Sequence, residues 1–148
     1  MKYQGERSLR APLGKLVTGV ALKLPPCDLI VPVPIDPARK ALRGFNQARD
    51  LAEEVSWSLR LNIGDALERR KTNISMAALS RADRWEEVKD SIGLTRSSAS
   101  LPLAGCRVLL VDDVVTTGAT ANACSRVLKR AGVAEVYVAA LARTPIWG

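Results

Sequence analysis

The sequence predicts an α/β fold with a mainly parallel sheet, and three observations support this. Short, nearly continuous apolar runs recur at residues 29–33, 107–111 and 136–141. Segments with helical apolar spacing lie between them. The chain has 148 residues and is 47% hydrophobic. Continuous apolar strands are buried on both faces, which is typical of parallel sheets covered by helices, and the length suits a single domain, residues 1–148.

The first third of the chain predicts a helix, a strand and a loop. Residues 1–26 form a leading helix and linker, because apolar residues at i, i+4, i+7 and i+11 indicate an amphipathic helix that ends before the Pro-Pro pair: Leu9, Leu13, Leu16 and Val20. The strand at 29–33 should end near Pro32 and Pro34, which lack N–H donors. Residues 34–43 are then expected to form a charged loop.

The middle of the chain predicts a second helix and a long polar segment. Helical spacing runs from Phe45 to Leu59. A short strand is expected within 65–69. Residues 70–103 turn polar and end in a Ser/Thr-rich stretch, so a long mobile excursion is expected there.

The last third predicts a strand, a turn, a helix and a strand. The strand at 107–111 precedes a Thr/Gly turn, and the helix after it has one apolar face: Cys124, Val127, Leu128 and Ala131. Gly132 can end that helix in the left-handed conformation. The apolar run at 136–141 forms the closing strand.

Cysteine and histidine usage excludes several kinds of site. Cys27, Cys106 and Cys124 form no C-x-x-C pair, and the chain has no histidine. This argues against a disulfide framework and against a protein-bound metal such as zinc, so buried thiols are expected. There is no apolar run of the roughly 20 residues that a membrane span requires, and no signal-peptide core, so the expected compartment is the cytoplasm.

The net charge of +7 and the pI near 9.8 favour polyanionic partners such as phosphates or nucleic acid. One basic cluster comprises Arg39, Lys40, Arg43 and Arg49, and a second runs from Arg69 to Arg84. Solvated surface charge is the alternative interpretation of both clusters.

The segment 108–120, VLLVDDVVTTGAT, carries the clearest chemistry. Gly118 permits a positive φ and a close approach of the backbone, so amides at the start of the next helix can bind a phosphate. The surrounding small residues complete that turn, and three of them add hydroxyl donors: Thr116, Thr117, Ala119 and Thr120. Asp112 and Asp113, expected after the strand and both ionised, would accept hydrogen bonds from the two hydroxyls of a ribose.

Three alternatives compete with this interpretation. Paired aspartates after a strand also occur in response-regulator receivers, but those lack a Thr/Gly turn at this position. Thr116 or Thr117 could simply cap a helix beside solvated aspartates. A Walker phosphate loop is excluded, because no Gly-Lys-Ser/Thr occurs in the chain.

The segment resembles the phosphoribosyl-pyrophosphate signature of type I phosphoribosyltransferases. A second stretch, CDLIVPVP at 27–34 followed by RGFNQA at 43–48, resembles the ComF/GntX branch of that family. The resemblance implies a type I phosphoribosyltransferase-like, five-stranded parallel sheet flanked by helices, with Arg39, Arg43 and Gly44 near a pyrophosphate. It also implies Mg2+ held mostly by the substrate.

Several positions depart from the family pattern. Relatives commonly carry an N-terminal zinc ribbon, and this chain shows none. Asp36 stands where a histidine is frequent, Met76 where glutamine is usual, and Glu87 where asparagine is usual. Trp85 either stacks on a base or packs the long excursion against the sheet.

Two hypotheses for the function follow. In the first, the protein binds 5-phosphoribosyl-1-pyrophosphate and transfers the phosphoribosyl group to an unidentified nitrogen acceptor, with no catalytic residue assigned. In the second, it is a non-catalytic sensor of sugar phosphates or nucleotides, or an accessory protein of DNA uptake in competence. Direct binding of nucleic acid ranks third because the chain has few aromatic residues. Either hypothesis is compatible with an oligomer.

Overall fold

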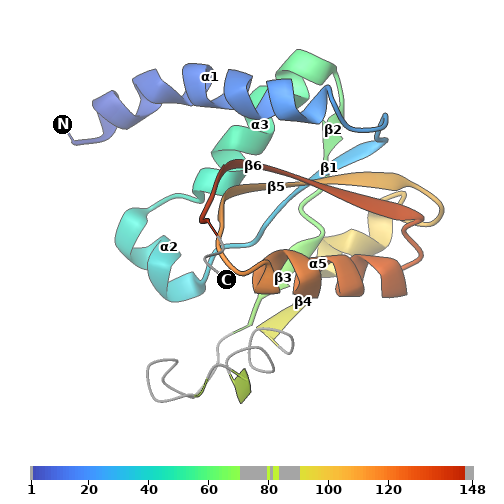
Figure 1. Ribbon diagram of the computed structural model, residues 1–148. Coiled ribbons are helices and arrows are strands. Elements are labelled where there is room, and N and C mark those ends of the chain that lie inside the picture. Colours follow the sequence, from blue (N-terminus) through green and yellow to red (C-terminus); the bar gives the residue numbers. More distant parts are fainter. Residues whose placement is uncertain (1, 71–79, 81, 84–90, 146–148) are drawn as a thin grey trace.

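The computed structural model describes residues 2–70, 80, 82–83 and 91–145. Its middle layer is a parallel sheet of four strands in the order β2-β1-β5-β6 (Figure 1). The strands are β1 (Leu29–Pro32), β2 (Asn62–Ile63), β5 (Arg107–Val115) and β6 (Glu135–Arg143). The predicted α/β class and parallel sheet are confirmed.

The sheet has four strands in the described residues, whereas the resemblance implied five. The short strand expected within 65–69 forms as β3 (Leu67–Arg69), but it pairs antiparallel with β4 (Ile92–Leu94) in a separate ribbon. This pairing takes β3 out of the main sheet.

Helices cover both faces of the sheet (Figure 1). One face carries α1 (Lys2–Ala21) and α3 (Gln47–Leu59), which bury a core around Ile30, Val55 and Leu109. The other face carries α5 (Ala119–Arg130) and the β3–β4 ribbon, whose core includes Val31, Leu110 and Leu128. Among the described residues, no helix combines the length and hydropathy that crossing a bilayer requires.

Helix α1 forms as predicted, but its buried side is not the leucine stripe. Val17 and Ala21 are buried and the predicted Leu13 is half-buried against the same core, whereas the predicted positions Leu9, Leu16 and Val20 are 56%, 62% and 42% exposed. The reason is the contact with α3 at Gly14. A Cβ built on Gly14 would overlap the Cβ of Glu54 and lie 2.8 Å from its Cγ, so the absence of a side chain sets how α1 is rotated.

Strand β1 ends at Pro32, as predicted from its prolines. The Ile30 carbonyl accepts from Gly64 N on the β2 side at 2.8 Å, so Pro32, two residues on, also faces that side. Strand β2 has ended there, and the missing N–H of Pro32 therefore removes no ladder hydrogen bond.

The charged loop expected at 34–43 is mostly a helix, α2 (Pro37–Arg43). Asp36 caps it, with Oδ1 accepting from Ala38 N at 2.7 Å, and Pro37 occupies its first turn. Gly44 ends it with φ of 77° and donates its N–H to the Lys40 carbonyl. Asp36 and Pro37 are residues typical of a helix start, but the prediction of a loop relied on the many charged residues of this segment.

The predicted excursion at 70–103 lies partly outside the described residues. From Ile92 onward the chain is packed, with β4 followed by a 3-10 helix at Arg96–Ser100. Ile92 and Leu103 are buried. Met76, Trp85 and Glu87 lie outside the described residues.

Candidate ligand site at the carboxyl edge of the sheet

Strand β5 delivers the predicted Thr/Gly turn to the carboxyl edge of the parallel sheet, where ligands of such folds bind. Gly118 has φ of 84°, and nothing lies within 4 Å of a Cβ built there. The conformation expected for Gly118 is therefore present, at the N-cap of α5, and it faces open space.

The first turn of α5 suits an anion. It contains no acidic residue, and the first amides of a helix have no partner within the helix. Gly118 is the N-cap of α5 and no side chain caps this helix; Thr117, the residue before the cap, accepts from Ala119 N through Oγ1 at 3.3 Å. This contact is longer than most N–H···O hydrogen bonds, so it holds the Ala119 amide only weakly.

The aspartates lie within β5, which runs four residues beyond its predicted end. Asp112 is only 8% exposed. Its Oδ1 accepts from Asp113 N at 2.8 Å, and Asp113 Oδ1 accepts from Val114 N at 2.8 Å. Both carboxylates thus bond to the backbone beside them, and this fixes their orientation at the end of the strand.

The protonation of Asp112 differs from expectation. Burial, and next the Asp113 side chain, raise the pKa of Asp112 from 3.8 to about 7. The raised pKa of Asp112 makes its ionised form less favourable than that of an exposed aspartate, which differs from the prediction of two fully ionised carboxylates. The sequence could not show this, because the desolvation comes from packing between strands.

Arg69 is a site residue that sequence analysis placed only in a general basic cluster. It ends β3, and its Nη2 donates to Thr120 Oγ1 at 3.2 Å. Its Nε is buried without a hydrogen-bond partner among the described residues. The Arg69 guanidinium also lowers the pKa of Asp112, against the larger effect of burial. A cation from the β3–β4 ribbon therefore lies beside both halves of the motif.

Arg39 and Arg43 lie on α2, the helix that follows β1 at the same edge (Figure 1). Both are exposed, and neither forms an ion pair within the described part of the chain. Gly44 ends this helix. Asp36, noted as a departure, is occupied in capping α2.

Arg49, the fourth member of the basic cluster, forms ion pairs within the protein. Its guanidinium lies 3.1 Å from Asp65 and 3.7 Å from Glu53. Glu53 also binds Arg10 of α1 at 3.1 Å. Since two carboxylates of the chain face Arg49, this member of the cluster pairs within the protein and matches neither an anion site nor freely solvated charge.

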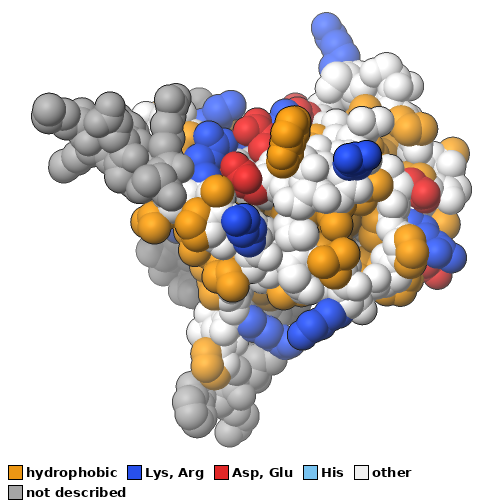
Figure 2. Space-filling view, turned by 90° about the horizontal axis from the view of Figure 1, so that it is seen from above, with side chains coloured by type: hydrophobic (Ala, Val, Ile, Leu, Met, Phe, Trp, Pro, Cys, Tyr) orange, Lys and Arg blue, Asp and Glu red, His pale blue; other side chains and the backbone are white. Residues whose placement is uncertain are grey.

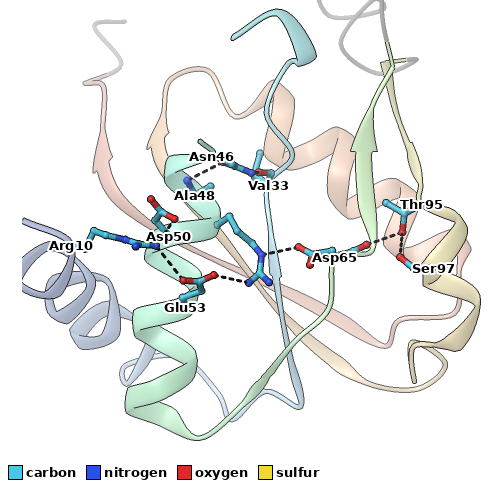
Figure 3. A network of polar contacts seen from close by, with 10 residues as sticks. Arg10, Val33, Asn46, Ala48, Asp50, Glu53, Asp65, Thr95 and Ser97 are labelled. Atoms are coloured by element: carbon cyan, nitrogen blue, oxygen red, sulfur yellow. Dashed lines mark hydrogen bonds and ion pairs between the residues drawn. The ribbon is translucent and has the colours of Figure 1, made fainter. Parts of the chain in front are cut away.

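Asn46 joins the end of β1 to the start of α3 (Figure 3). Its Nδ2 donates to the Val33 carbonyl at 3.2 Å, and its Oδ1 accepts from Ala48 N at 3.0 Å as the N-cap. A groove of about 490 Å³ runs beside it, lined in part by Lys40, Arg49 and Asp65. The RGFNQA stretch thus contributes a fixed corner next to α2.

Residues 43–146 match the family described as "Phosphoribosyl transferase domain". Competence protein F of Haemophilus influenzae is 40% identical over 123 residues, which are 82% of this chain and 52% of that protein. Competence protein ComFC of Streptococcus pneumoniae is 30% identical over 96% of this chain and 60% of its own length. DNA utilization protein YhgH of Escherichia coli K12 is 36% identical over 83% of this chain and 52% of its own length. The chain therefore spans little more than half the length of these relatives.

Solved structures share the fold at low identity. The glutamine phosphoribosylpyrophosphate amidotransferase of B. subtilis, complexed with ADP and GMP, aligns with a TM-score of 0.59 and 21% identity over 90% of this chain and 26% of that one. UMP synthase of Leishmania donovani aligns with a TM-score of 0.52 and 16% identity, and the alignment covers 93% of this chain and 27% of that one. The chain belongs to the phosphoribosyl transferase domain family, in its ComF branch.

Proposed function

We propose that the protein binds 5-phosphoribosyl-1-pyrophosphate at the carboxyl edge of the sheet. The turn from Thr116 to Thr120 binds the 5′-phosphate, and Asp112 with Asp113 binds the ribose hydroxyls. Arg39, Arg43 and Gly44 face the pyrophosphate. The observation that carries the proposal is Gly118, left-handed and open to solvent at the N-terminus of α5, directly after two oriented carboxylates.

Arg69 supports the same assignment. A buried guanidinium nitrogen without a partner is unfavourable unless an acceptor satisfies it. The 5′-phosphate offers acceptors only, and the Arg69 guanidinium lies on Thr120 of the phosphate turn. A planar guanidinium also matches phosphate oxygens in pairs.

Magnesium is proposed as a partner of the substrate. Mg2+ prefers about six oxygen ligands, and no group of three carboxylate, cysteine or histidine side chains gathers in the described residues. Asp112 and Asp113 are the acidic residues of the motif. A magnesium ion there would take most of its ligands from the pyrophosphate, the ribose and water.

The proposed reaction transfers the phosphoribosyl group to an unidentified nitrogen acceptor. The nitrogen attacks the anomeric carbon while the bond to pyrophosphate breaks, and positive charge develops on the ribose ring. The chain's residues position the sugar and neutralise the leaving pyrophosphate. No side chain is assigned as the base.

Calorimetric titration of phosphoribosyl pyrophosphate, with and without Mg2+, tests the binding. The double variant Asp112→Asn/Asp113→Asn should bind at least about tenfold more weakly, since each charge-assisted hydrogen bond contributes about 1.5–3 kcal/mol. Arg130→Gln, an exposed position in the last turn of α5, is the matched control and should bind like the wild type. Absence of saturable binding to folded wild type would refute the proposal.

A role in DNA uptake is the second candidate, because the similar curated proteins are named for competence and DNA utilization. In this role the protein senses a sugar phosphate or nucleotide in the cytoplasm without transferring it. Pyrophosphate release with a panel of nitrogenous bases separates the two functions. Direct DNA binding would weaken steeply with salt, whereas a ligand held in the site would depend on salt much less.

A further inference from the structure

Helix α2 differs from α1, α3 and α5 in that none of its residues is buried. Pro37 is half-buried, every residue from Ala38 to Arg43 is exposed, and Leu42 is 86% exposed. Most of the stability of a protein helix comes from packing of its apolar face, and helices shorter than about 12 residues are marginal without it. The seven residues of α2 therefore lack the contacts that would hold a helix in one position.

A groove separates α2 from the body of the protein. It has a volume of about 490 Å³, and α2 contributes Pro37 and Lys40 to its lining. At about 30 Å³ per water molecule this volume corresponds to about 16 waters, which is ample for a pyrophosphate group. The other lining residues belong to the segment before α2, to the start of α3 and to the chain around the start of β3: Ile35, Asn46, Arg49, Asp65 and Leu67.

The two ends of α2 allow the helix to move as a unit. Asp36 Oδ1 accepts from Ala38 N at 2.7 Å, which ties the first turn of α2 to the residue before it. At the other end Gly44 has φ of 77°, and nothing lies within 4 Å of a Cβ built there. A glycine in open space tolerates changes of φ and ψ that a side chain would prevent. Gly44 can therefore serve as a hinge between α2 and α3.

The charges of α2 favour an anion in the groove. Arg39, Lys40 and Arg43 form no ion pair within the described residues, and α2 contains no acidic residue. Arg39 and Arg43 are four residues apart, a spacing at which like charges destabilise a helix. On the face covered by α1 and α3, in contrast, basic and acidic side chains lie among one another (Figure 2), and Arg10 pairs there with two carboxylates of α3. The repulsion within α2 is left for a bound anion to relieve.

We propose that α2 closes toward the body of the protein when the pyrophosphate group of the ligand enters the groove, and that Lys40 is the side chain of α2 that contacts this group. The inference rests on the proposed binding of phosphoribosyl pyrophosphate and adds a moving part to that site. Lys40 is the cation of α2 that lines the groove. At 3.6 residues per turn, Arg43 lies about 60° and Arg39 about 100° around the helix from Lys40, so Arg43 is the next closest to the groove.

The opposite wall of the groove is held in place, so the movement belongs to α2. The Arg49 guanidinium lies 3.1 Å from Asp65, and Asn46 bonds to the Val33 carbonyl and to Ala48 N. Closure gives α2 the contacts that it lacks in the open form, and the anion reduces the repulsion among its cations. Binding of the pyrophosphate and ordering of α2 are therefore coupled.

Amide hydrogen exchange with and without inorganic pyrophosphate tests the closure. The amides of Lys40 and Gly44 donate to the carbonyls of Asp36 and Lys40. Both amides should exchange rapidly in the free protein and at least about tenfold more slowly at saturating pyrophosphate. The amides of Ala52 and Val55, which are buried in α3, are the matched control and should be protected equally in both states.

The outcomes separate the closure from the proposed function. If calorimetry shows that pyrophosphate is bound while the exchange of the α2 amides is unchanged, the closure is overturned and the proposed binding stands. If pyrophosphate does not bind, both the closure and the pyrophosphate assignment are overturned. Ribose 5-phosphate, which lacks the pyrophosphate group, then tests the turn at 116–120 by itself and should leave the exchange of α2 unchanged.

Variants of Lys40 test the contact with the anion. Lys40→Gln should raise the Kd for pyrophosphate about tenfold or more, because it removes a charge-assisted hydrogen bond, whereas Lys40→Arg keeps the charge and should retain most of the affinity. Lys15→Gln, which changes an exposed lysine of α1 outside the groove, is the matched control and should bind like the wild type. Equal affinities of Lys40→Gln and Lys15→Gln would show that Lys40 does not contact the pyrophosphate.

Discussion

Replacing Asp112 by asparagine should make the protein more stable at alkaline pH. Burial raises the pKa of Asp112 from 3.8 to about 7, so the folded state binds a proton more tightly than the unfolded chain. Stability from this group is complete below about pH 4 and is lost as the pH rises toward 7. Asparagine is neutral throughout and keeps an oxygen to accept from Asp113 N.

The size of the effect follows from the shift. The pKa of Asp112 rises by about three, and each unit corresponds to about 1.4 kcal/mol, so the loss of stability caused by ionising Asp112 is at most roughly 4 kcal/mol. Arg69 stabilises the ionised form of Asp112 and reduces the effect, so we expect about 2 kcal/mol at about pH 8 and almost none at about pH 4. The same substitution should weaken ligand binding, because a neutral amide is a poorer acceptor for ribose hydroxyls.

Urea unfolding of wild type and Asp112→Asn at both pH values measures this. Glu68→Gln is the matched control, since it removes one exposed carboxylate from the neighbouring β3, and its effect should stay within about 0.5 kcal/mol at both pH values. If Asp112→Asn were less stable than wild type at about pH 8, or if the difference were the same at both pH values, the assignment of a buried, partly protonated carboxyl would be wrong.

Two further predictions concern the scaffold. Gly14→Ala should destabilise the folded protein by about 1–2 kcal/mol, because overlap of the new Cβ with Glu54 outweighs the gain of about 1 kcal/mol in helix propensity. Gly19→Ala should stabilise the protein by about 0.5–1 kcal/mol, because nothing lies within 4 Å of a Cβ at that position. Thermal unfolding checks the pair, and a Gly14 variant as stable as the Gly19 variant would show that α1 and α3 do not meet closely. Asn46→Ala should lower the unfolding free energy by about 1–2 kcal/mol, through loss of the cap and of the bond to the Val33 carbonyl. Chemical denaturation measures this, and an unchanged midpoint would remove Asn46 from its linking role.

The sequence predicted those parts of the fold that depend on local pattern. Apolar runs located β1, β5 and β6, and helical spacing located α3 and α5. Even the caps of α2 were readable at Asp36 and Gly44. The buried side of α1 was not, because it is decided by the contact between Gly14 and Glu54, forty residues away.

In the candidate site, too, the sequence predicted what depends on neighbouring residues and missed what depends on contacts between distant ones. Gly118 and the threonines follow one another in the chain, so one segment reveals them. Arg69 reaches Thr120 only because the β3–β4 ribbon folds against α5, and no spacing in the sequence records that approach. The altered protonation of Asp112 likewise arises from burial between neighbouring strands.

The hydrogen bond from Arg69 to Thr120 also has a consequence for the hydroxyl group of Thr120, which lies in the turn at 116–120. With its oxygen already accepting from the guanidinium, the Thr120 hydroxyl has its proton left to offer. A phosphate oxygen entering the turn could accept this proton and would be attracted by the Arg69 guanidinium, whereas an ammonium group would be repelled by Arg69. If the turn at 116–120 binds a ligand as proposed, Arg69 and the Thr120 hydroxyl would therefore favour an anion over a cation.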